Sequence, residues 1–549
     1  MAGRKERTGL SEYFLAGRKL PWYVVGSSFI ASNISSEHFI GMIGAAYIYG
    51  LCVSMSCWGN INSFSFLIWF FIPFLLASKV FTTPEFLEKR YNTALREIFA
   101  VVTVISNIVA FLAAVLYGGG LALQTLFGWP LWFAIITLGV VAGTWAIYGG
   151  LSSVAWTDFF TVIVMMTGGF IVVVLGFKML AGDSGTIIDG FKIMLERNQA
   201  KTGIWAEAVS RTSQRLAHID NYNRMAVIQP ATHQVTPWPS LIFGVFSVSI
   251  WYNVLNQFMI QRVLGAKNMY HARMGIVLAG YMQIILPLII VVPGMIMFAR
   301  FPETLLLPWD QVRPEADKAY VNMVQMLVPI GLRGLILASL FGAIQSTVNS
   351  VLNSTATIIT LDIYRRIFRP AASDRHLVKV GIGISVTVLI IAIGLAGMIG
   401  KLGASLFVYI QTLYAFFAPP FAAIFLLGIF WRRINSTGAT AAVLLGFTLY
   451  IAMKLYVFLI PSHPVWIEPY GIQGAVTWSF CMIICIVFSL ATKPPPEDRV
   501  TDLLVFNWEK LNIFSDLGTK WYNSVVLWWG LFALLVIMLI VTFSGLVYK

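Results

Sequence analysis

Residues 31–38 of this chain read Ala31-Ser32-Asn33-Ile34-Ser35-Ser36-Glu37-His38. They lie inside an otherwise apolar segment from about Trp22 to Tyr49, which is long enough to cross a bilayer. A polar group at membrane depth is costly unless it is paired or lines a cavity. Serines that bond back to their own helix explain some of the hydroxyls. They do not explain Glu37 and His38, so we favour a pathway for a solute or an ion.

The composition is that of a polytopic membrane protein. The chain has 549 residues, of which 58% are hydrophobic and 11% are charged. Soluble domains carry about 25% charged residues. The net charge of +13 comes from Lys and Arg in short loops between apolar runs, a pattern typical of cytoplasmic loops, so it does not predict nucleic-acid binding. The four cysteines lie within apolar runs, and we expect them to be reduced.

The apolar runs predict about thirteen membrane spans, with the N-terminus in the cytoplasm and the C-terminus outside. Basic clusters near residues 90, 262, 366, 433 and 493 then all face the cytoplasm. We expect a short turn at residues 149–153 between spans 4 and 5, and a kink or stop at Pro419-Pro420 in span 10. The predicted segments are a cytoplasmic N-terminus (1–20), spans 1–5 (21–181), an outer loop (182–238), spans 6–10 (239–433) and spans 11–13 (434–549).

Five crossings end on the opposite side of the membrane from where they began, so spans 6–10 start on the side opposite to spans 1–5. The two sets therefore have inverted orientations, as in the inverted repeats of secondary transporters. Span 6 is polar in its middle, as span 1 is. Its polar and aromatic residues there are Ser247, Ser249, Trp251, Tyr252, Asn253, Asn256 and Gln257. Any one of the aromatics alone can be an ordinary packing residue. Two interrupted helices at matching positions, however, indicate a binding site near the midplane.

Span 8 carries Ala343, Ser346 and Thr347 at spacings that place them on one helical face. Two hydroxyls, together with free carbonyls from an unwound span 1, would offer oxygen ligands to a small hard cation. Hydroxyls that bond to the carbonyl four residues earlier explain the same residues. The sequence leaves both interpretations open.

Two further polar residues lie within spans. Asp158, at the inner mouth of span 5, can attract a cation on its exit path, or it can be an acidic residue facing a helix N-terminus. Gln411 lies in the middle of span 10, beside Tyr409, where its amide can hydrogen-bond a hydroxylated solute.

Several short motifs follow one another along the chain: Ser11-Glu12-Tyr13-Phe14-Leu15-Ala16-Gly17-Arg18, the stretch from Ala31 to Gly41, Thr83-Pro84-Glu85-Phe86, Tyr148-Gly149-Gly150-Leu151, Trp156-Thr157-Asp158, Asn256-Gln257 with Gln261-Arg262, Leu352-Asn353-Ser354-Thr355-Ala356-Thr357 and Phe430-Trp431-Arg432. Together they resemble the solute:sodium symporter family, most closely its sodium/sugar (glucose/galactose) cotransporter branch. The resemblance covers residues 11 to about 440 in order. The resemblance implies an all-α, LeuT-like five-plus-five inverted repeat with discontinuous helices 1 and 6, and about three extra C-terminal helices.

The resemblance also implies roles for individual residues. The sodium site would comprise the carbonyls of Ala31, Ile34 and Ala343 with the hydroxyls of Ser346 and Thr347. The solute contacts would be Asn33, His38, Asn60, Ser249, Asn253, Gln283 and Gln411. Tyr252 would be the inner gate, and Met42, Ser56 and Phe407 the outer lid. Na⁺ would be the coupling ion, and we expect no other metal and no organic cofactor.

The chain departs from the family pattern at the solute site. Cys57 replaces a glutamate that binds sugar hydroxyls in the bacterial carriers, and Gln283 replaces a common lysine. Asn253 and Ser56 replace aromatic residues. The site therefore lacks both charged residues of the family pattern, and the one charged residue beside it is Glu37. The identity of the solute stays open.

These patterns predict a sodium-driven symporter that imports a small neutral hydroxylated solute, in first place a monosaccharide, by alternating access. We expect it in the plasma membrane, which in a bacterium is the inner membrane. The alternatives are a symporter for a polyol, a carboxylate or an amino acid derivative, and an uncoupled channel or sensor. We do not expect an enzyme, because no nucleophile–base pair is visible.

Overall fold

The computed structural model describes residues 16–78, 82–216, 222–400, 405–507 and 513–545. The predicted cytoplasmic segment 1–20 therefore lies mostly outside the described residues. Within the described ranges, eleven helices are long and apolar enough to cross a membrane. The interrupted first crossing and the shorter apolar segment Leu131–Thr144 bring the count to the predicted thirteen.

The helices fall into the expected order. The first five crossings are built from α2 (Trp22–Asn33), η2 (Glu37–Met42), α3 (Ile43–Tyr49), η3 (Leu51–Ser54), α4 (Met55–Trp58), α5 (Ile61–Phe66), η4 (Leu67–Phe71), α6 (Ile72–Ser78), α7 (Thr83–Arg90), α8 (Thr93–Ser106), η5 (Asn107–Leu112), α9 (Ala113–Phe127) and α10 (Leu131–Ala181). The long connection that follows contains α11 (Ile187–Asn198) and α12 (Gly203–Leu216).

The second five crossings are built from α13 (Trp238–Ile242), α14 (Gly244–Ile250), η6 (Trp251–Leu255), α15 (Gln257–Leu264), α16 (Met269–Arg300), α17 (Trp309–Asp317), α18 (Ala319–Leu327), α19 (Ile330–Ile358), η8 (Ile359–Phe368), α20 (Asp374–Ile399) and α21 (Leu406–Phe430). The last three crossings are α22 (Ser436–Leu459), α23 (Tyr470–Ala491) and α24 (Val525–Thr542).

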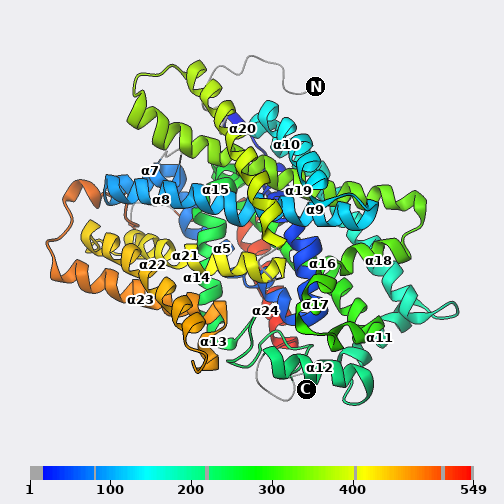
Figure 1. The fold of residues 1–549 in the computed structure, drawn as a ribbon. Helices are drawn as coiled ribbons and strands as arrows, with labels where there is room; N and C mark the ends of the chain where they lie inside the picture. Colours follow the sequence, from blue (N-terminus) through cyan, green and yellow to red (C-terminus); the bar gives the residue numbers. More distant parts are fainter. Residues whose placement is uncertain (1–15, 79–81, 217–221, 401–404, 508–512, 546–549) are drawn as a thin grey trace.

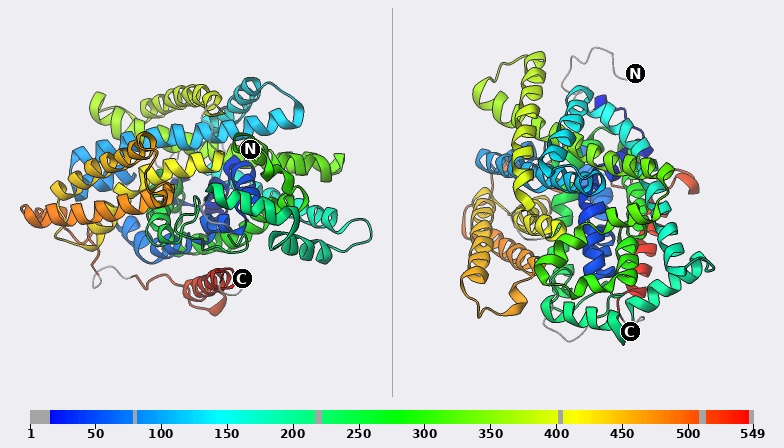
Figure 2. Two further views of the ribbon diagram at one scale, coloured as in Figure 1. Left: turned by 60° about the horizontal axis from the view of Figure 1, so that its bottom comes forward. Right: turned by 45° about the vertical axis from the view of Figure 1, so that its right-hand side comes forward.

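The first crossing runs through the middle of the bundle, where α2 packs against α10, α16 and α19 (Figure 1). Its contact with α16 depends on small residues: a Cβ on Gly26 would lie 2.5 Å from the carbonyl oxygen of Gly275. The pair α22 and α23 lies to one side and packs on α21, while α11 and α12 lie at one end of the bundle (Figures 1 and 2). The polar stretch is thus enclosed by both repeats.

The structure revises two sequence expectations about helix ends. A helical backbone continues through residues 149–153, where a turn is predicted, so one element, α10, covers Leu131–Ala181. Its two apolar segments, Leu131–Thr144 and Val154–Ala181, still count as two crossings. Pro419 and Pro420 lie inside α21, which continues to Phe430, so of the predicted kink or stop the stop is wrong. Neighbouring helices make such prolines tolerable in a membrane.

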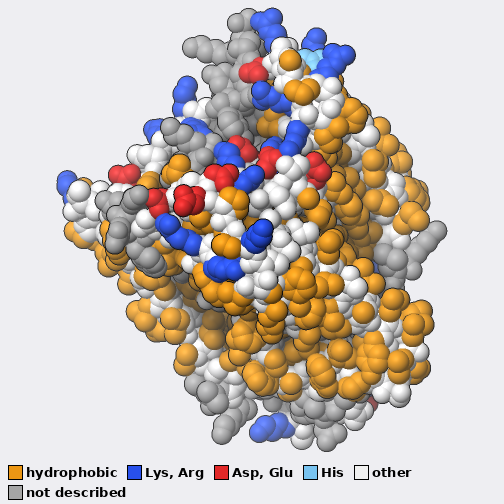
Figure 3. All heavy atoms as spheres, turned by 90° about the vertical axis from the view of Figure 1, so that its left-hand side faces the viewer, with side chains coloured by type: hydrophobic (Ala, Val, Ile, Leu, Met, Phe, Trp, Pro, Cys, Tyr) orange, Lys and Arg blue, Asp and Glu red, His pale blue; other side chains and the backbone are white. Residues whose placement is uncertain are grey.

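The surface of the bundle is largely apolar, with a localised group of charges. Figure 3 shows hydrophobic side chains over much of one face, crossed by a belt of acidic and basic side chains. One charged cluster joins the two repeats: Glu88 on α7 bonds to Arg96 and Arg366 at 2.5 Å, and Arg96 reaches Asp362 on η8 at 2.5 Å. Partial burial alone would raise the pKa of the Glu88 carboxyl, but hydrogen bonds from Arg96, Thr93 and Arg366 outweigh it and hold the pKa below its usual value.

The variant Glu88→Gln should lower the free energy of unfolding at neutral pH by about 1–3 kcal/mol, because the bonds to Glu88 are charge-assisted. A carboxyl with a lowered folded pKa stabilises the fold above its unfolded pKa of about 4.3, and this stabilisation disappears as the pH falls through the folded pKa. The measurement is the thermal unfolding of purified wild type and Glu88→Gln over a range of pH. The stabilities of the two proteins should become equal at acidic pH. Glu97→Gln, at an exposed position on α8, is the control and should change stability by about 0.5 kcal/mol or less. A difference for Glu88→Gln that persists below the folded pKa would contradict the account.

Candidate functional site

The first crossing is broken in its polar stretch. The helix α2 ends at Asn33, and Ile34 has the extended angles φ −73° and ψ 122°, before η2 begins at Glu37. The last carbonyls of a helix have no partner within it. Here these carbonyls are buried, so they must be satisfied from another element.

Helix α19 supplies the facing group. The hydroxyl oxygen of Thr347 lies 3.3 Å from the carbonyl oxygens of both Ser32 and Ile34, and 3.2 Å from that of Ala343. The hydroxyl of Ser346 is also buried and has no hydrogen-bond partner among the described residues. We call these five residues the oxygen pocket. It offers only neutral oxygens, the ligand type that small hard cations take, and its donor set therefore fits Na⁺.

Four of the five predicted sodium ligands meet in this pocket. The family resemblance implies the carbonyl of Ala31, whereas the carbonyl that lies beside Thr347 is that of Ser32. The hydroxyl of Thr347 also lies within hydrogen-bond distance of the Ala343 carbonyl, four residues earlier, as one of the two interpretations of the span 8 hydroxyls expects. The other interpretation, a cation ligand, stays a prediction. The role of each ligand stays a prediction.

A buried ion pair lies next to the oxygen pocket. One guanidinium nitrogen of Arg262 on α15 lies 3.6 Å from the carboxylate of Asp158 on α10. The Ser28 hydroxyl donates to Asp158 at 2.6 Å, and Arg262 also donates to Ser28 and Ser350. Ser346 interacts more distantly with the same carboxylate. The carboxylate of Asp158 thus contacts side chains of α2 and α15, and its role stays a prediction.

The sixth crossing is broken at the matching place. Asn256, between η6 and α15, has φ −68° and ψ 122°, almost the angles of Ile34. Both polar atoms of its side chain are buried and have no hydrogen-bond partner among the described residues. The two breaks confirm the discontinuous helices predicted for spans 1 and 6.

A cavity opens directly beside the first break. It is lined by Asn33, Glu37, His38, Met42, Met55, Ser56, Asn60, Val235, Thr236, Ser240, Gly244, Val245, Val248, Ser249, Tyr252, Gln411, Tyr414, Ala415, Tyr470, Gly471 and Gly474. No Lys or Arg is among these described lining residues. Small-molecule sites are concave and mostly apolar, with a few polar groups that fix the ligand, so we call it the solute cavity.

Two predicted solute residues lie behind the cavity wall and hold residues that line it. Gln283 on α16 donates to the side-chain oxygen of Asn33 at 3.1 Å. Asn253 donates to the side-chain oxygen of Asn60 at 2.9 Å, and Ser249 donates to the same oxygen at 2.9 Å. The other five predicted contacts, namely Asn33, His38, Asn60, Ser249 and Gln411, line the cavity itself.

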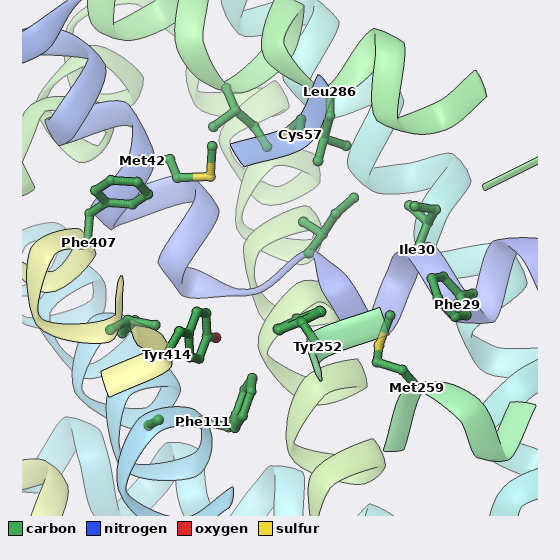
Figure 4. Close-up of a cluster of buried hydrophobic side chains, with 14 of the residues drawn as sticks. Phe29, Ile30, Met42, Cys57, Phe111, Tyr252, Met259, Leu286, Phe407 and Tyr414 are labelled. Carbon is green, nitrogen blue, oxygen red and sulfur yellow. The ribbon is translucent and has the colours of Figure 1, made fainter. Parts of the chain in front are cut away.

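Aromatic residues close one side of the cavity. The ring of Tyr252 lies 5.6 Å from that of Tyr414 and 5.7 Å from that of Phe111, measured between centroids. Figure 4 shows these three rings on one side of the non-helical segment of the first crossing and Met42 on the other. Phe407 does not line the cavity: it is fully buried, and its backbone would contact a Cβ on Gly41 at 3.1 Å.

Among the lining residues that sequence reasoning did not predict, three carry ionisable side chains. Glu37 has no predicted role, although it lines the wall. Tyr414 lies three residues after Gln411 on the same helix, and this spacing is a signal that could have found it. Tyr470 begins α23, outside the two repeats, where the sequence pattern gives no indication of a site.

A membrane bundle whose first and sixth crossings are broken beside an oxygen pocket and a polar cavity is a secondary transporter of the broken-helix class. Comparison with known proteins identifies the family. The model of the sodium:solute symporter family matches residues 13–446, and the chain belongs to this family. Its members couple transport to Na⁺.

Three similar proteins illustrate the relationship. The sodium/glucose cotransporter of Vibrio parahaemolyticus is 35% identical over 495 residues, which cover 89% of this chain and 86% of the relative. The sodium/myo-inositol cotransporter of Bos taurus is 32% identical and covers 94% and 74%. A substrate-bound, outward-open Na⁺-coupled sialic acid symporter has the same fold, with a TM-score of 0.71 at 20% identity, covering 89% of this chain and 94% of that one.

The variant Asp158→Asn should destabilise the protein by about 3–5 kcal/mol, because it leaves the Arg262 guanidinium buried without its counter-charge. The double variant Asp158→Asn with Arg262→Gln should lose less than the sum of the two single changes, since the first loss already includes the broken pair. Thermal unfolding in detergent measures all three, with the exposed Asp183→Asn as the control. Strictly additive losses would show that the two side chains do not interact.

Proposed function

We propose that this protein imports a small, uncharged, polyhydroxylated solute together with Na⁺ by alternating access. The solute is a sugar or a cyclic polyol. Two relatives carry the names sodium/glucose and sodium/myo-inositol cotransporter, and these names support the solute class.

One observation carries the proposal: a single backbone break serves two sites. The carbonyls of Ser32 and Ile34 face Thr347 in the oxygen pocket, while Asn33, between them in sequence, lines the solute cavity. A cation held by the carbonyls fixes the conformation of this segment and thereby the position of Asn33. A ligand shifts a conformational equilibrium only by its differential affinity for the two states, and such a shared segment provides that difference.

The lining of the solute cavity favours a neutral solute. Its polar groups are amides, hydroxyls and one imidazole, with Glu37 as the acidic group. Hydroxyl groups of a solute both donate and accept, so they can satisfy these side chains together. An anionic solute would need a fixed cation, and the described lining residues provide none.

The proposed orientation places the N-terminus in the cytoplasm and the C-terminus outside. The basic residues at the ends of the crossings support it, because positive loops remain on the cytoplasmic side. The solute cavity then extends toward the outer face, since its lining includes Val235 and Thr236 in the long connection and Tyr470 at the start of α23. The inner side is closed by Tyr252, Tyr414 and Phe111.

The variant Thr347→Val should abolish sodium-stimulated uptake, a loss of at least about tenfold if the hydroxyl contributes 1.4 kcal/mol or more to the coupled state. Valine keeps the shape of threonine and removes only its oxygen. The measurement is uptake of radiolabelled D-glucose and myo-inositol into proteoliposomes, with and without an inward Na⁺ gradient. Thr347→Ser, which keeps the hydroxyl, is the matched control and should retain sodium stimulation.

Normal sodium dependence of Thr347→Val would reject the oxygen pocket as the sodium site. Wild-type uptake that is equally fast without a Na⁺ gradient would instead favour a channel-like protein. If neither probe is taken up or competes for uptake, the sugar and polyol class is wrong.

A further inference from the structure

Glu37 is a buried carboxylic acid that the sodium site does not use. It is the first residue of η2, directly after the break, and its side chain lines the solute cavity. Its backbone N–H donates to the hydroxyl of Ser35 at 3.1 Å, so the local chain fixes where the side chain emerges. An ionisable residue inside a membrane bundle is costly and is a candidate functional group.

The contacts of Glu37 do not explain it as a structural residue. The hydroxyl of Tyr414 donates to one carboxylate oxygen at 3.3 Å, and no ion pair of Glu37 is formed within the described part of the chain. A carboxylate has about four acceptor positions, so one hydrogen bond leaves most of its capacity unused. The buried guanidinium of Arg262 is paired with Asp158 instead. The free acceptor capacity of Glu37 therefore faces the cavity.

The neighbours of Glu37 provide the opposite kind of group. The Nδ1 atom of His38 accepts from the backbone N–H of Ser35 at 3.3 Å, so the neutral imidazole carries its proton on Nε2 and is a donor there. The oxygen of the Asn33 side chain is occupied by Gln283, which leaves the amide nitrogen as a donor. The wall thus presents donors at Asn33 and His38 on either side of an acceptor at Glu37.

We propose that Glu37 is a specificity-determining residue that accepts hydrogen bonds from two neighbouring hydroxyls of the solute. This inference rests on the proposed function. Vicinal hydroxyls can donate to the two carboxylate oxygens while they accept from the donors of His38 and Asn33. Glu37 therefore discriminates between polyols by the presence and position of these two hydroxyls.

The test compares wild type with Glu37→Gln at saturating Na⁺, using equilibrium binding of myo-inositol, D-glucose and their monodeoxy analogues to purified protein. Wild type should bind the analogue that lacks a contacting hydroxyl at least tenfold more weakly than the parent. Glu37→Gln should bind the parent at least tenfold more weakly, and it should discriminate between parent and analogue less than threefold.

In the absence of solute, the Na⁺ concentration that half-saturates this variant should stay within twofold of the wild-type value. Glu97→Gln, at an exposed position on α8, should match wild type in every assay. Glu37→Asp, one methylene shorter, serves if the glutamine variant does not fold, and it should change which deoxy analogue is discriminated. The proposal is overturned if both Glu37 variants discriminate between parent and deoxy analogue as wild type does. It is also overturned if their Na⁺ dependence shifts tenfold while their solute selectivity is unchanged. Failure of the proposed function is separate: wild type would then bind none of the probes.

Discussion

The structure depends on the carbonyl oxygens that α2 exposes where it ends at Asn33. In the interior of a membrane bundle these groups cannot be satisfied by water, and an extended residue at Ile34 prevents the helix from satisfying them. The hydroxyl of Thr347, from the other repeat, lies within 3.3 Å of two of these carbonyls. A break that is costly by itself thereby becomes the place where the two repeats meet.

The buried polar groups around the break in the first crossing form three layers: the oxygen pocket, the ion pair beside it and the solute cavity. The oxygen pocket contains only neutral groups, while the charges of Asp158 and Arg262 pair beside it and are tied to α2 through Ser28. The solute cavity lies on the other side of the same segment, with Gln283 and Asn253 supporting residues of its wall. Each layer uses a different part of the first crossing, so a movement of α2 affects all of them.

Much of this arrangement could be predicted from the sequence. Polar residues in two apolar runs indicated both broken crossings, and the spacing of Ala343, Ser346 and Thr347 indicated the facing side of α19. Which carbonyl lies beside Thr347 could not be predicted, because it depends on the backbone angles of Ile34. The helical backbone at residues 149–153 was missed because glycine permits a turn without requiring one. Tyr470 was missed because its packing against the repeats is a tertiary contact that leaves no periodic pattern in the sequence.

The central claim, that one broken segment links a cation to a solute, is tested most directly by thermodynamic linkage. Equilibrium binding of ²²Na⁺ to the purified protein is measured with and without saturating solute, and solute binding with and without Na⁺. The account predicts that each ligand raises the affinity of the other by the same factor, about 5–150 for couplings of 1–3 kcal/mol. Saturable Na⁺ binding whose affinity is unchanged by solute would contradict it.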